Sequence, residues 1–346
     1  MKQNKFWILV LLALLGVTVF IILREQSYGD LILAVRRAHL LPLLLGVGLM
    51  FIFECCETAC TYLILSALGN RTSFFRCLTY SFAGFYFSCI TPASSGGQPA
   101  QIYCMQQDRV PIAHGTLDML LIAIFYQGVT LLFALAALLL FPGLLSVFGL
   151  GSGLLLGVGA AILLLLTVAM LIFLWFPALA AKLSGAVLRL FARLRLVKDL
   201  SAARESLDLH LTQYHQGAAL IRRRPELAPA LFVIMAIQLS ALYLVPFMVY
   251  TAFGFAGAGL LRFVATQALL SLAVYCVPLP GAAGVSEAVF LRVYAGLFGA
   301  AAVAPALLLS RGISCYGFLV LTGILTALIQ MQKRRKKNAV PLPDCQ

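Results

Sequence analysis

Long uncharged apolar runs alternate with short polar stretches along this chain. Residues 6–23, 119–181 and 227–261 contain no Asp, Glu, Lys or Arg. A helix of about 20 apolar residues spans the hydrocarbon core of a bilayer, whereas a soluble surface helix carries a polar face. The pattern predicts spanning helices near 5–23, 40–67, 112–140, 152–176, 228–252 and 303–330. The chain is therefore predicted to be an all-α polytopic membrane protein.

Two further apolar stretches are interrupted at their midpoints by turn-forming residues. Residues 75–110 contain Thr91-Pro92-Ala93-Ser94-Ser95-Gly96-Gly97-Gln98-Pro99, and residues 260–299 contain Pro278-Leu279-Pro280-Gly281-Ala282-Ala283-Gly284. Each flank is about 15 residues long, too short to cross the membrane. Irregular backbone at membrane depth is tolerated where it is buried in protein or lines a polar cavity. We predict two re-entrant helical hairpins, with turn residues Pro92, Gly96, Gly97, Pro280, Gly281 and Gly284.

The order of these elements repeats. Helix, hairpin and helix over residues 40–140 are followed by the same order over 228–330, and the second hairpin enters from the opposite side. Inverted repeats with broken helices near the midplane are typical of transporters. The spacing Pro92-x3-Gly96 matches Pro280-x3-Gly284, but 14 Pro and 28 Gly produce roughly one such match by chance. The position of the turns therefore supports the inverted repeat more strongly than their sequence does.

Composition and charge agree with a membrane location. Hydrophobic residues make up 62% of the chain and charged residues 11%, against about 25% charged in soluble domains. The net charge of +13 comes from basic residues beside helix ends, such as Arg222-Arg223-Arg224. If both termini are cytoplasmic, 19 Lys and Arg lie inside and 4 outside, as the positive-inside rule requires. Anionic headgroups, and not nucleic acid, are the expected partners of this charge.

Residues 178–226 form the long polar segment between the two repeats. Apolar residues recur there at helical spacing: Leu183, Val187, Leu190, Phe191, Leu194 and Val197. The segment is predicted to be an amphipathic insertion that lies on the cytoplasmic membrane surface or packs beneath the bundle. We divide the chain into one transmembrane domain over residues 1–332, which contains this insertion, and a basic cytoplasmic tail over 333–346.

Ionisable side chains within the predicted membrane segments are few, and such groups commonly face a cavity or a partner. Glu54 and Glu57 lie one turn apart on one helix face, where they could share a proton or a cation. Arg311 lies mid-span, and its planar fork is suited to a phosphate; a Glu287–Arg311 salt bridge that only joins helices is the alternative. Asp118 is also ionisable. The predicted substrate cavity comprises Glu54, Glu57, Ser94, Ser95, Gln98, Gln101, Glu287, Arg292 and Arg311.

No catalytic constellation is visible in the sequence. A metalloprotease needs histidines on a buried helix, whereas the four histidines lie in loops or at helix ends: His39, His114, His210 and His215. Ser94 and Ser95 have no neighbouring base. The nine cysteines contain no CxxC motif and are interpreted as free thiols, with a metal site at Cys56 and Cys60 as the less favoured alternative. We expect no catalytic residues, no metal and no cofactor.

The segments Thr91–Gln101 and Pro280–Glu287, together with Tyr28-Gly29-Asp30-Leu31, resemble the lysylphosphatidylglycerol synthase transmembrane-region family, also called flippase-like domain proteins. The resemblance implies a protein of the bacterial cytoplasmic membrane that moves an aminoacylated or other phospholipid between leaflets and contributes to resistance against cationic peptides. In two-part members a soluble domain synthesises the lysyl lipid. This chain stops at Gln346, 14 residues beyond the predicted transmembrane domain (1–332), so we expect it not to be a lysyltransferase.

Three functional hypotheses follow. The first is a phospholipid flippase, in which Arg292 or Arg311 lies near the phosphate and the buried glutamates near a cationic group. The second is a carrier for a small polar solute or ion. The third is a membrane partner of a separate soluble aminoacyl-transferase that docks on residues 178–225.

Overall fold

The computed structural model describes residues 38–176, 222–275 and 277–338, together with 182, 209, 211–214 and 216–220. Every regular element in these residues is helical. Five segments are long and apolar enough to cross a membrane: α3 (Leu40–Ala67), α6 (Ile112–Leu140), α7 (Leu144–Trp175), α10 (Leu227–Ala252) and the run Val303–Met331. The predicted all-α polytopic fold is thus confirmed; the predicted helix near 5–23 lies outside the described residues.

Both predicted hairpins have a helix–turn–helix form. The first comprises α4 (Phe74–Ile90), the 3-10 turn η1 (Pro92–Ser94) and α5 (Gly97–Gln107). The second comprises α11 (Leu260–Val274), the 3-10 turn η2 (Pro280–Ala282) and α12 (Val285–Phe298). The half-helices have 11 to 17 residues, fewer than the roughly 20 that span a bilayer. The two turns contact each other, so the hairpins meet within the molecule.

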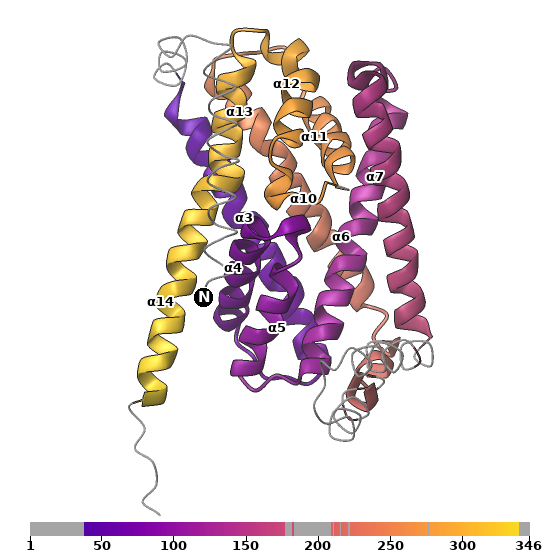
Figure 1. The fold of residues 1–346 in the computed structure, drawn as a ribbon, viewed down its shortest axis with the longest axis vertical. Helices are drawn as coiled ribbons and strands as arrows, with labels where there is room; N and C mark the ends of the chain where they lie inside the picture. Colours follow the sequence, from indigo (N-terminus) through magenta and orange to yellow (C-terminus); the bar gives the residue numbers. More distant parts are fainter. Residues whose placement is uncertain are drawn as a thin grey trace, which may run out of the picture.

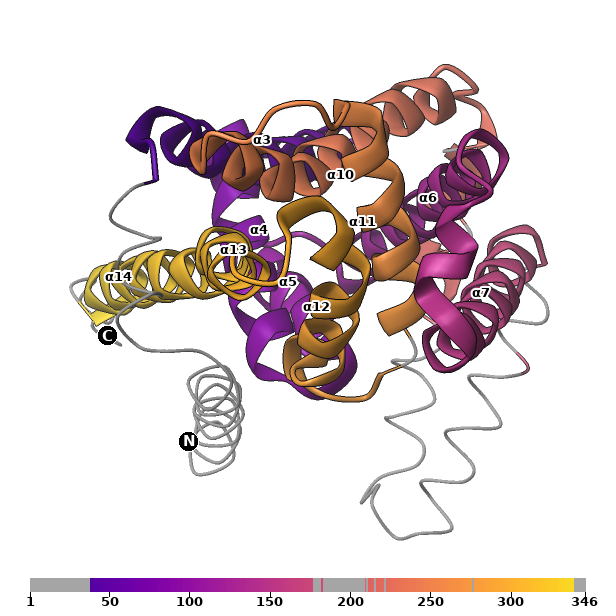
Figure 2. The same cartoon turned by 90° about the horizontal axis from the view of Figure 1, so that it is seen from above.

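The hairpins enter from opposite ends of the bundle (Figure 1). The first occupies the lower half of the view, between α3 and α6, and the second occupies the upper half, between α10 and α13 (Val303–Arg311). Seen along the bundle, α4, α5, α11 and α12 lie between α14 (Phe318–Asn338) at one edge and α7 at the opposite edge (Figure 2). The described part of the chain therefore has the inverted order expected from its sequence.

The two turns share a backbone conformation at the two residues after each proline and differ at the glycine that follows, where φ is −84° for Gly96 and 85° for Gly284. The first and second residues after each proline are left-handed: Ala93 (φ 49°), Ser94 (φ 55°), Gly281 (φ 59°) and Ala282 (φ 51°). Gly96 and Gly284 then stand at the N-cap of the following half-helix. The weak Pro-x3-Gly echo therefore marks equivalent turns. A left-handed residue other than glycine costs about 1–2 kcal/mol, and such strain persists where the surrounding structure imposes it, often at functional sites.

Glycines allow close contact between the half-helices and their neighbours. A Cβ at Gly97 would overlap the Ser88 hydroxyl and lie 2.8 Å from the Gly84 carbonyl oxygen, where α5 meets α4. A Cβ at Gly159 would overlap the Leu272 carbonyl oxygen, where α7 meets α11. Small residues at such contacts let backbones approach closely, which is how helices associate in a membrane without a hydrophobic driving force.

The last predicted helix, 303–330, is not continuous. It consists of α13, a π-helical segment η3 (Gly312–Gly317) and α14. A Cβ at Gly317 would lie 2.7 Å from the Gly312 carbonyl oxygen, so the widened turn depends on glycine. The predicted span 303–330 is confirmed as the run Val303–Met331, but its π-helical turn was not predicted; such turns occur frequently at functional sites. Helix α7 also begins at Leu144 and not near 152. The residues before and after the left-handed Gly149 (φ 64°) are both helical, so this glycine kinks the helix and does not start it.

The insertion between the repeats is described only in part. Tyr214 and Ala218 are buried in the core cluster, and the Tyr214 ring packs edge-on against Phe173 with centroids 5.6 Å apart. This described part of the insertion therefore packs against the transmembrane helices. The amphipathic stretch 183–197 lies outside the described residues.

Candidate functional site

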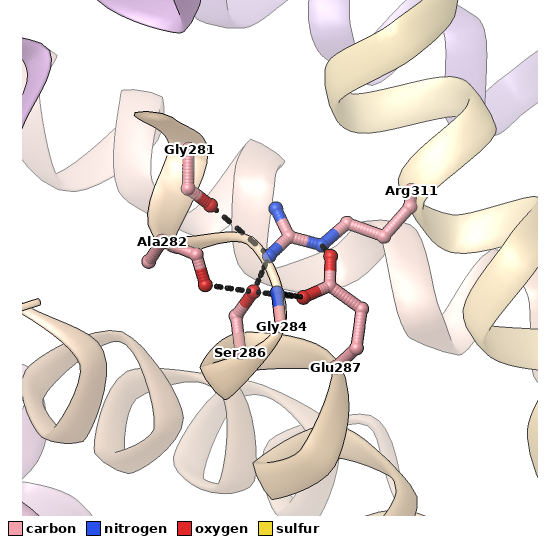
Figure 3. A network of polar contacts seen from close by, with 6 residues as sticks. All are labelled: Gly281, Ala282, Gly284, Ser286, Glu287 and Arg311. Carbon is pink, nitrogen blue, oxygen red and sulfur yellow. Dashed lines mark hydrogen bonds and ion pairs between the residues drawn. The ribbon is translucent and has the colours of Figure 1, made fainter. Parts of the chain in front are cut away.

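The tip of the second hairpin holds a buried ion pair. Arg311, the last residue of α13, places Nε 3.2 Å from Glu287 Oε1, and its Nη2 donates to the Gly281 carbonyl oxygen at 3.3 Å and to Ser286 Oγ (Figure 3). The Glu287 side chain is 5% exposed and the Arg311 side chain 22% exposed. The salt bridge considered as an alternative in the sequence is therefore present, and its arginine side chain is partly exposed.

Glu287 also closes the turn that precedes its own helix. Its Oε2 accepts from the Gly284 N–H at 2.6 Å, and Ser286 Oγ lies 2.9 Å from the same oxygen. The position in the first turn of α12 favours a carboxylate, because a helix N-terminus is partly positive. In the first hairpin the equivalent Gly96 N–H donates instead to Thr91 Oγ1 at 2.9 Å. Of these two turns, the second is therefore closed by a charged side chain and the first by a neutral one.

Several polar groups converge where the hairpins meet. Arg311 directly precedes the π-helix η3, η2 contacts η1, and the Cys89 thiol at the end of α4 interacts with the Cys315 thiol of η3. Backbone groups outside regular helices need polar partners at this depth, because lipid supplies none. The junction therefore combines a cation, a carboxylate and irregular backbone in one place.

The tip of the first hairpin carries exposed polar side chains. Ser94, Ser95 and Gln98 are exposed, whereas Gln101 is 6% exposed. Since this tip lies halfway along the bundle (Figure 1), its hydroxyl and amide groups would be costly against lipid tails. These exposed polar groups therefore need water or a polar ligand at this depth, and the cavity predicted from the sequence stays a prediction.

A second polar cluster lies in the first repeat. Glu57 Oε2 on α3 accepts from Gln238 Nε2 on α10 at 2.9 Å, and the Gln101 amide of α5 also hydrogen-bonds to Glu57. Glu54 is 1% exposed, and its carboxyl oxygens have no hydrogen-bond partner among the described residues. Asp118 of α6 is fully buried and interacts with the Thr61 hydroxyl of α3. This cluster joins four helices around three carboxyl groups.

Sequence reasoning identified this second cluster incompletely. Glu54, Glu57 and Gln101 were predicted to line the cavity, whereas Asp118 was noted as ionisable but given no role, and Gln238 was missed. The available signal for Gln238 was an amide side chain in the middle of the uncharged run 227–261.

Arg292 lies apart from both clusters. It is exposed on α12, and its Nε donates to the Val147 carbonyl oxygen at 3.4 Å. It therefore joins α12 to the beginning of α7, and the structure does not bring it to Glu287 or Arg311 as the predicted cavity implied.

The described residues contain no group of three or more His, Cys, Asp or Glu side chains that could hold a metal ion. The less favoured metal site at Cys56 and Cys60 thus finds no support in this part of the chain. In the described part of the chain, seven cysteines form no disulfide bond: Cys55, Cys56, Cys60, Cys77, Cys89, Cys104 and Cys315.

An open apolar groove of about 370 Å³ runs between α3 and α10. Its walls include exposed side chains such as Ile52, Val233 and Ile237. The full lining is Leu49, Ile52, Phe232, Val233, Ala236, Ile237, Ser240, Ala241 and Leu244. Glu57 and Gln238 come from the same two helices, so the groove and the second cluster share one helix pair.

Comparison with known proteins gives one result for the whole chain. The family model described as "Lysylphosphatidylglycerol synthase TM region" matches residues 7–322, which include both hairpins and both polar clusters. No curated protein matches the chain.

Proposed function

We propose that this chain, which belongs to the lysylphosphatidylglycerol synthase TM region family, moves a phospholipid between the leaflets of the cytoplasmic membrane. The family connects the protein with a membrane lipid-related function. The observation that carries the finer proposal is the convergence of Arg311, Glu287 and two hairpin tips halfway through the bundle. A headgroup that crosses the membrane must pass this depth, where it needs polar partners.

Arg311 is suited to the lipid phosphate. Its described contacts use Nε and Nη2, so among these contacts Nη1 remains to donate to a phosphate oxygen. A guanidinium keeps its charge at any physiological pH and forms strong hydrogen bonds with phosphate. Glu287 and the carboxyl groups of the second cluster would attract a cationic headgroup, as in a zwitterionic or aminoacylated lipid.

The groove between α3 and α10 favours a lipid over a small solute. It is apolar and open to the outside of the bundle, where an acyl chain could lie while the headgroup occupies the junction. The second hypothesis, a carrier for a small polar solute, does not account for this groove, because its apolar walls offer such a solute few hydrogen-bond partners.

We propose that the end of the bundle at the bottom of Figure 1 faces the cytoplasm. The loop after α3 carries Arg71, the loop after α5 carries Arg109, and Arg222-Arg223-Arg224 precede α10 at the same end. Helix α14 also runs to this end, toward the basic residues 333–337. This arrangement follows the positive-inside rule and would place both termini in the cytoplasm.

Reconstitution tests the proposal. The purified full chain in phosphatidylglycerol-containing vesicles should exchange a fluorescent phospholipid between leaflets faster than vesicles without protein do. Equal exchange rates would overturn it. The proposal is for transport without aminoacyl transfer, so the same protein incubated with lysyl-tRNA should form no lysyl lipid.

A further inference from the structure

Three buried carboxyl groups lie together in the first repeat without a basic partner. Glu54 and Glu57 interact with each other, and Asp118 interacts with Glu57. Among the described residues, the salt bridge found joins Arg311 to Glu287, and none joins a Lys, Arg or His to these three carboxyl groups. The cluster therefore contains up to three negative charges and no compensating cation.

The other titratable groups near this cluster come from helices α3, α4 and α6. Cys60 of α3 and Cys77 of α4 face Asp118, Tyr126 of α6 faces Glu57, and Cys89 of α4 faces Glu54. His114, one turn from Asp118 toward the basic end of α6, hydrogen-bonds to Asn70 at 2.9 Å. None of the thiols or phenols supplies positive charge at neutral pH.

Ionised carboxylates are costly in this setting. Each buried ion loses several kcal/mol of hydration free energy, and like charges close together add repulsion. Glu54 has no hydrogen-bond partner among the described residues, whereas the Thr61 hydroxyl interacts with Asp118 and offsets part of its cost. The described residues provide no three-ligand metal group, whereas a proton needs a single oxygen. Protonation is thus the simplest way to remove the unfavourable charge.

The two glutamines provide an independent indication of a bound proton. Gln238 is fully buried and Gln101 is 6% exposed. Both amides contact Glu57, yet both Oε1 atoms lack a partner among the described residues. The cluster therefore has more hydrogen-bond acceptors than donors. Each proton bound to a carboxylate removes one negative charge and adds one donor, and buried polar groups require such partners.

The carboxyl groups lead from the basic end of the bundle to the hairpin junction. Asp118 lies six residues into α6, or about 9 Å from its start, and Glu54 lies near the middle of α3. Cys89 interacts with Glu54, and also with Cys315 and Arg311 at the junction. Cys89 therefore lies within electrostatic range of both the cluster and the site to which we assign the lipid phosphate.

We propose that Glu54, Glu57 and Asp118 form a proton-binding site that couples lipid transport to a proton gradient. A proton adds to one carboxylate oxygen, forms a neutral carboxyl group and later leaves as the same proton, so no other bond changes. The binding site stands on the geometry above, and the coupling rests on the proposed lipid transport.

Infrared spectroscopy of the full chain in lipid nanodiscs tests proton binding without transport. At neutral pH we expect absorption from protonated carboxyl groups that decreases in Glu57→Gln and in Asp118→Asn. The exposed Glu226 provides the control Glu226→Gln, which should leave the band unchanged. Absence of a protonated-carboxyl band in the unmodified protein would overturn the site, even if the variants fail to fold.

Lipid exchange under opposed pH gradients tests the coupling. For one proton per lipid, one pH unit should shift the leaflet distribution about tenfold, and Asp118→Asn should abolish this shift. Exchange that ignores the gradient would overturn the coupling and leave the lipid function standing. Exchange that needs Na⁺ and stops when choline replaces it would overturn the proton as the ligand. Absence of exchange in every condition would overturn both the lipid function and its coupling, while the infrared result decides proton binding by itself.

Discussion

Neutralising Glu287 tests what the ion pair at the hairpin junction contributes. Arg311 Nε and Glu287 Oε1 are 3.2 Å apart, which corresponds to about 5 kcal/mol of attraction at an effective dielectric constant of 20. Removal of one partner from a buried pair costs about 3–5 kcal/mol, because the other charge is left uncompensated. Since Arg311 is 22% exposed, solvent screens part of this interaction, and we expect Glu287→Gln to cost about 3 kcal/mol.

Thermal unfolding of the solubilised full chain measures this cost. At roughly 2 °C per kcal/mol for a chain of this size, Glu287→Gln should lower the midpoint by about 6 °C. Arg311→Gln should lower it less, because Glu287 keeps its contacts with Gly284 and Ser286. The matched control Arg292→Gln, at an exposed arginine, should melt like the unmodified protein. Midpoints for both junction variants equal to that control would refute the reasoning.

The doubly neutral variant separates a structural role from a functional one. With both Glu287→Gln and Arg311→Gln, no uncompensated charge remains, so the midpoint should recover most of the loss. If the pair only joined η2 to the last helix, this variant would also transport lipid normally. Our account predicts a folded protein whose lipid exchange falls at least about tenfold, because one charge-assisted phosphate contact contributes roughly 1.5–3 kcal/mol. Normal exchange by the folded double variant would remove Arg311 from the mechanism.

Three further predictions concern packing, backbone strain and topology. Gly159→Ala should lower the unfolding midpoint by several degrees, because the new Cβ would overlap a backbone carbonyl of α11. The control Gly157→Ala has open space around the new Cβ and should leave the midpoint unchanged. Equal midpoints for the two variants would argue against this contact. Ala282→Gly should raise stability by about 1 kcal/mol by relieving a left-handed alanine, and a lower midpoint would contradict the strain. Cysteines at Asn70 and Ser146 should react with an impermeant thiol reagent from opposite sides of the membrane, the first from the cytoplasm; labelling from one side would contradict the topology.

The spanning helices were largely predictable because charge and proline delimit them. The predicted ranges 40–67 and 112–140 coincide with α3 and α6, which are bounded by polar loops and by Pro111. The hairpins were predictable because the turns at Pro92 and Pro280 divide two apolar segments into halves that are each too short to span the membrane. These are local constraints, and a sequence states them directly.

The π-helix after Arg311 depends on a distant part of the chain. Its geometry lets Arg311 reach Gly281, which lies 30 positions earlier in the chain, and Ser286, which lies 25 positions earlier. Gly312 and Gly317 permit the widened turn, but glycines are common in membrane helices and do not require one. The break was therefore not predictable from local pattern alone.

The residues of the site were harder to predict than the fold. Helical spacing shows which residues share a face, but it does not show what that face meets. Arg292 lies five residues from Glu287, yet the packing of α12 against α7 directs it to Val147. Asp118 and Gln238 joined the cluster around Glu57 only through the packing of α6 and α10 against α3.

The central claim is that the junction of the two hairpins carries a phospholipid headgroup across the membrane. Its most direct test is leaflet exchange of a fluorescent phospholipid in vesicles that contain the unmodified chain, the folded double variant of Glu287 and Arg311, or no protein. The account predicts rapid exchange with the unmodified chain and a rate close to that of empty vesicles with the double variant. Equal rates for the unmodified chain and empty vesicles would contradict it.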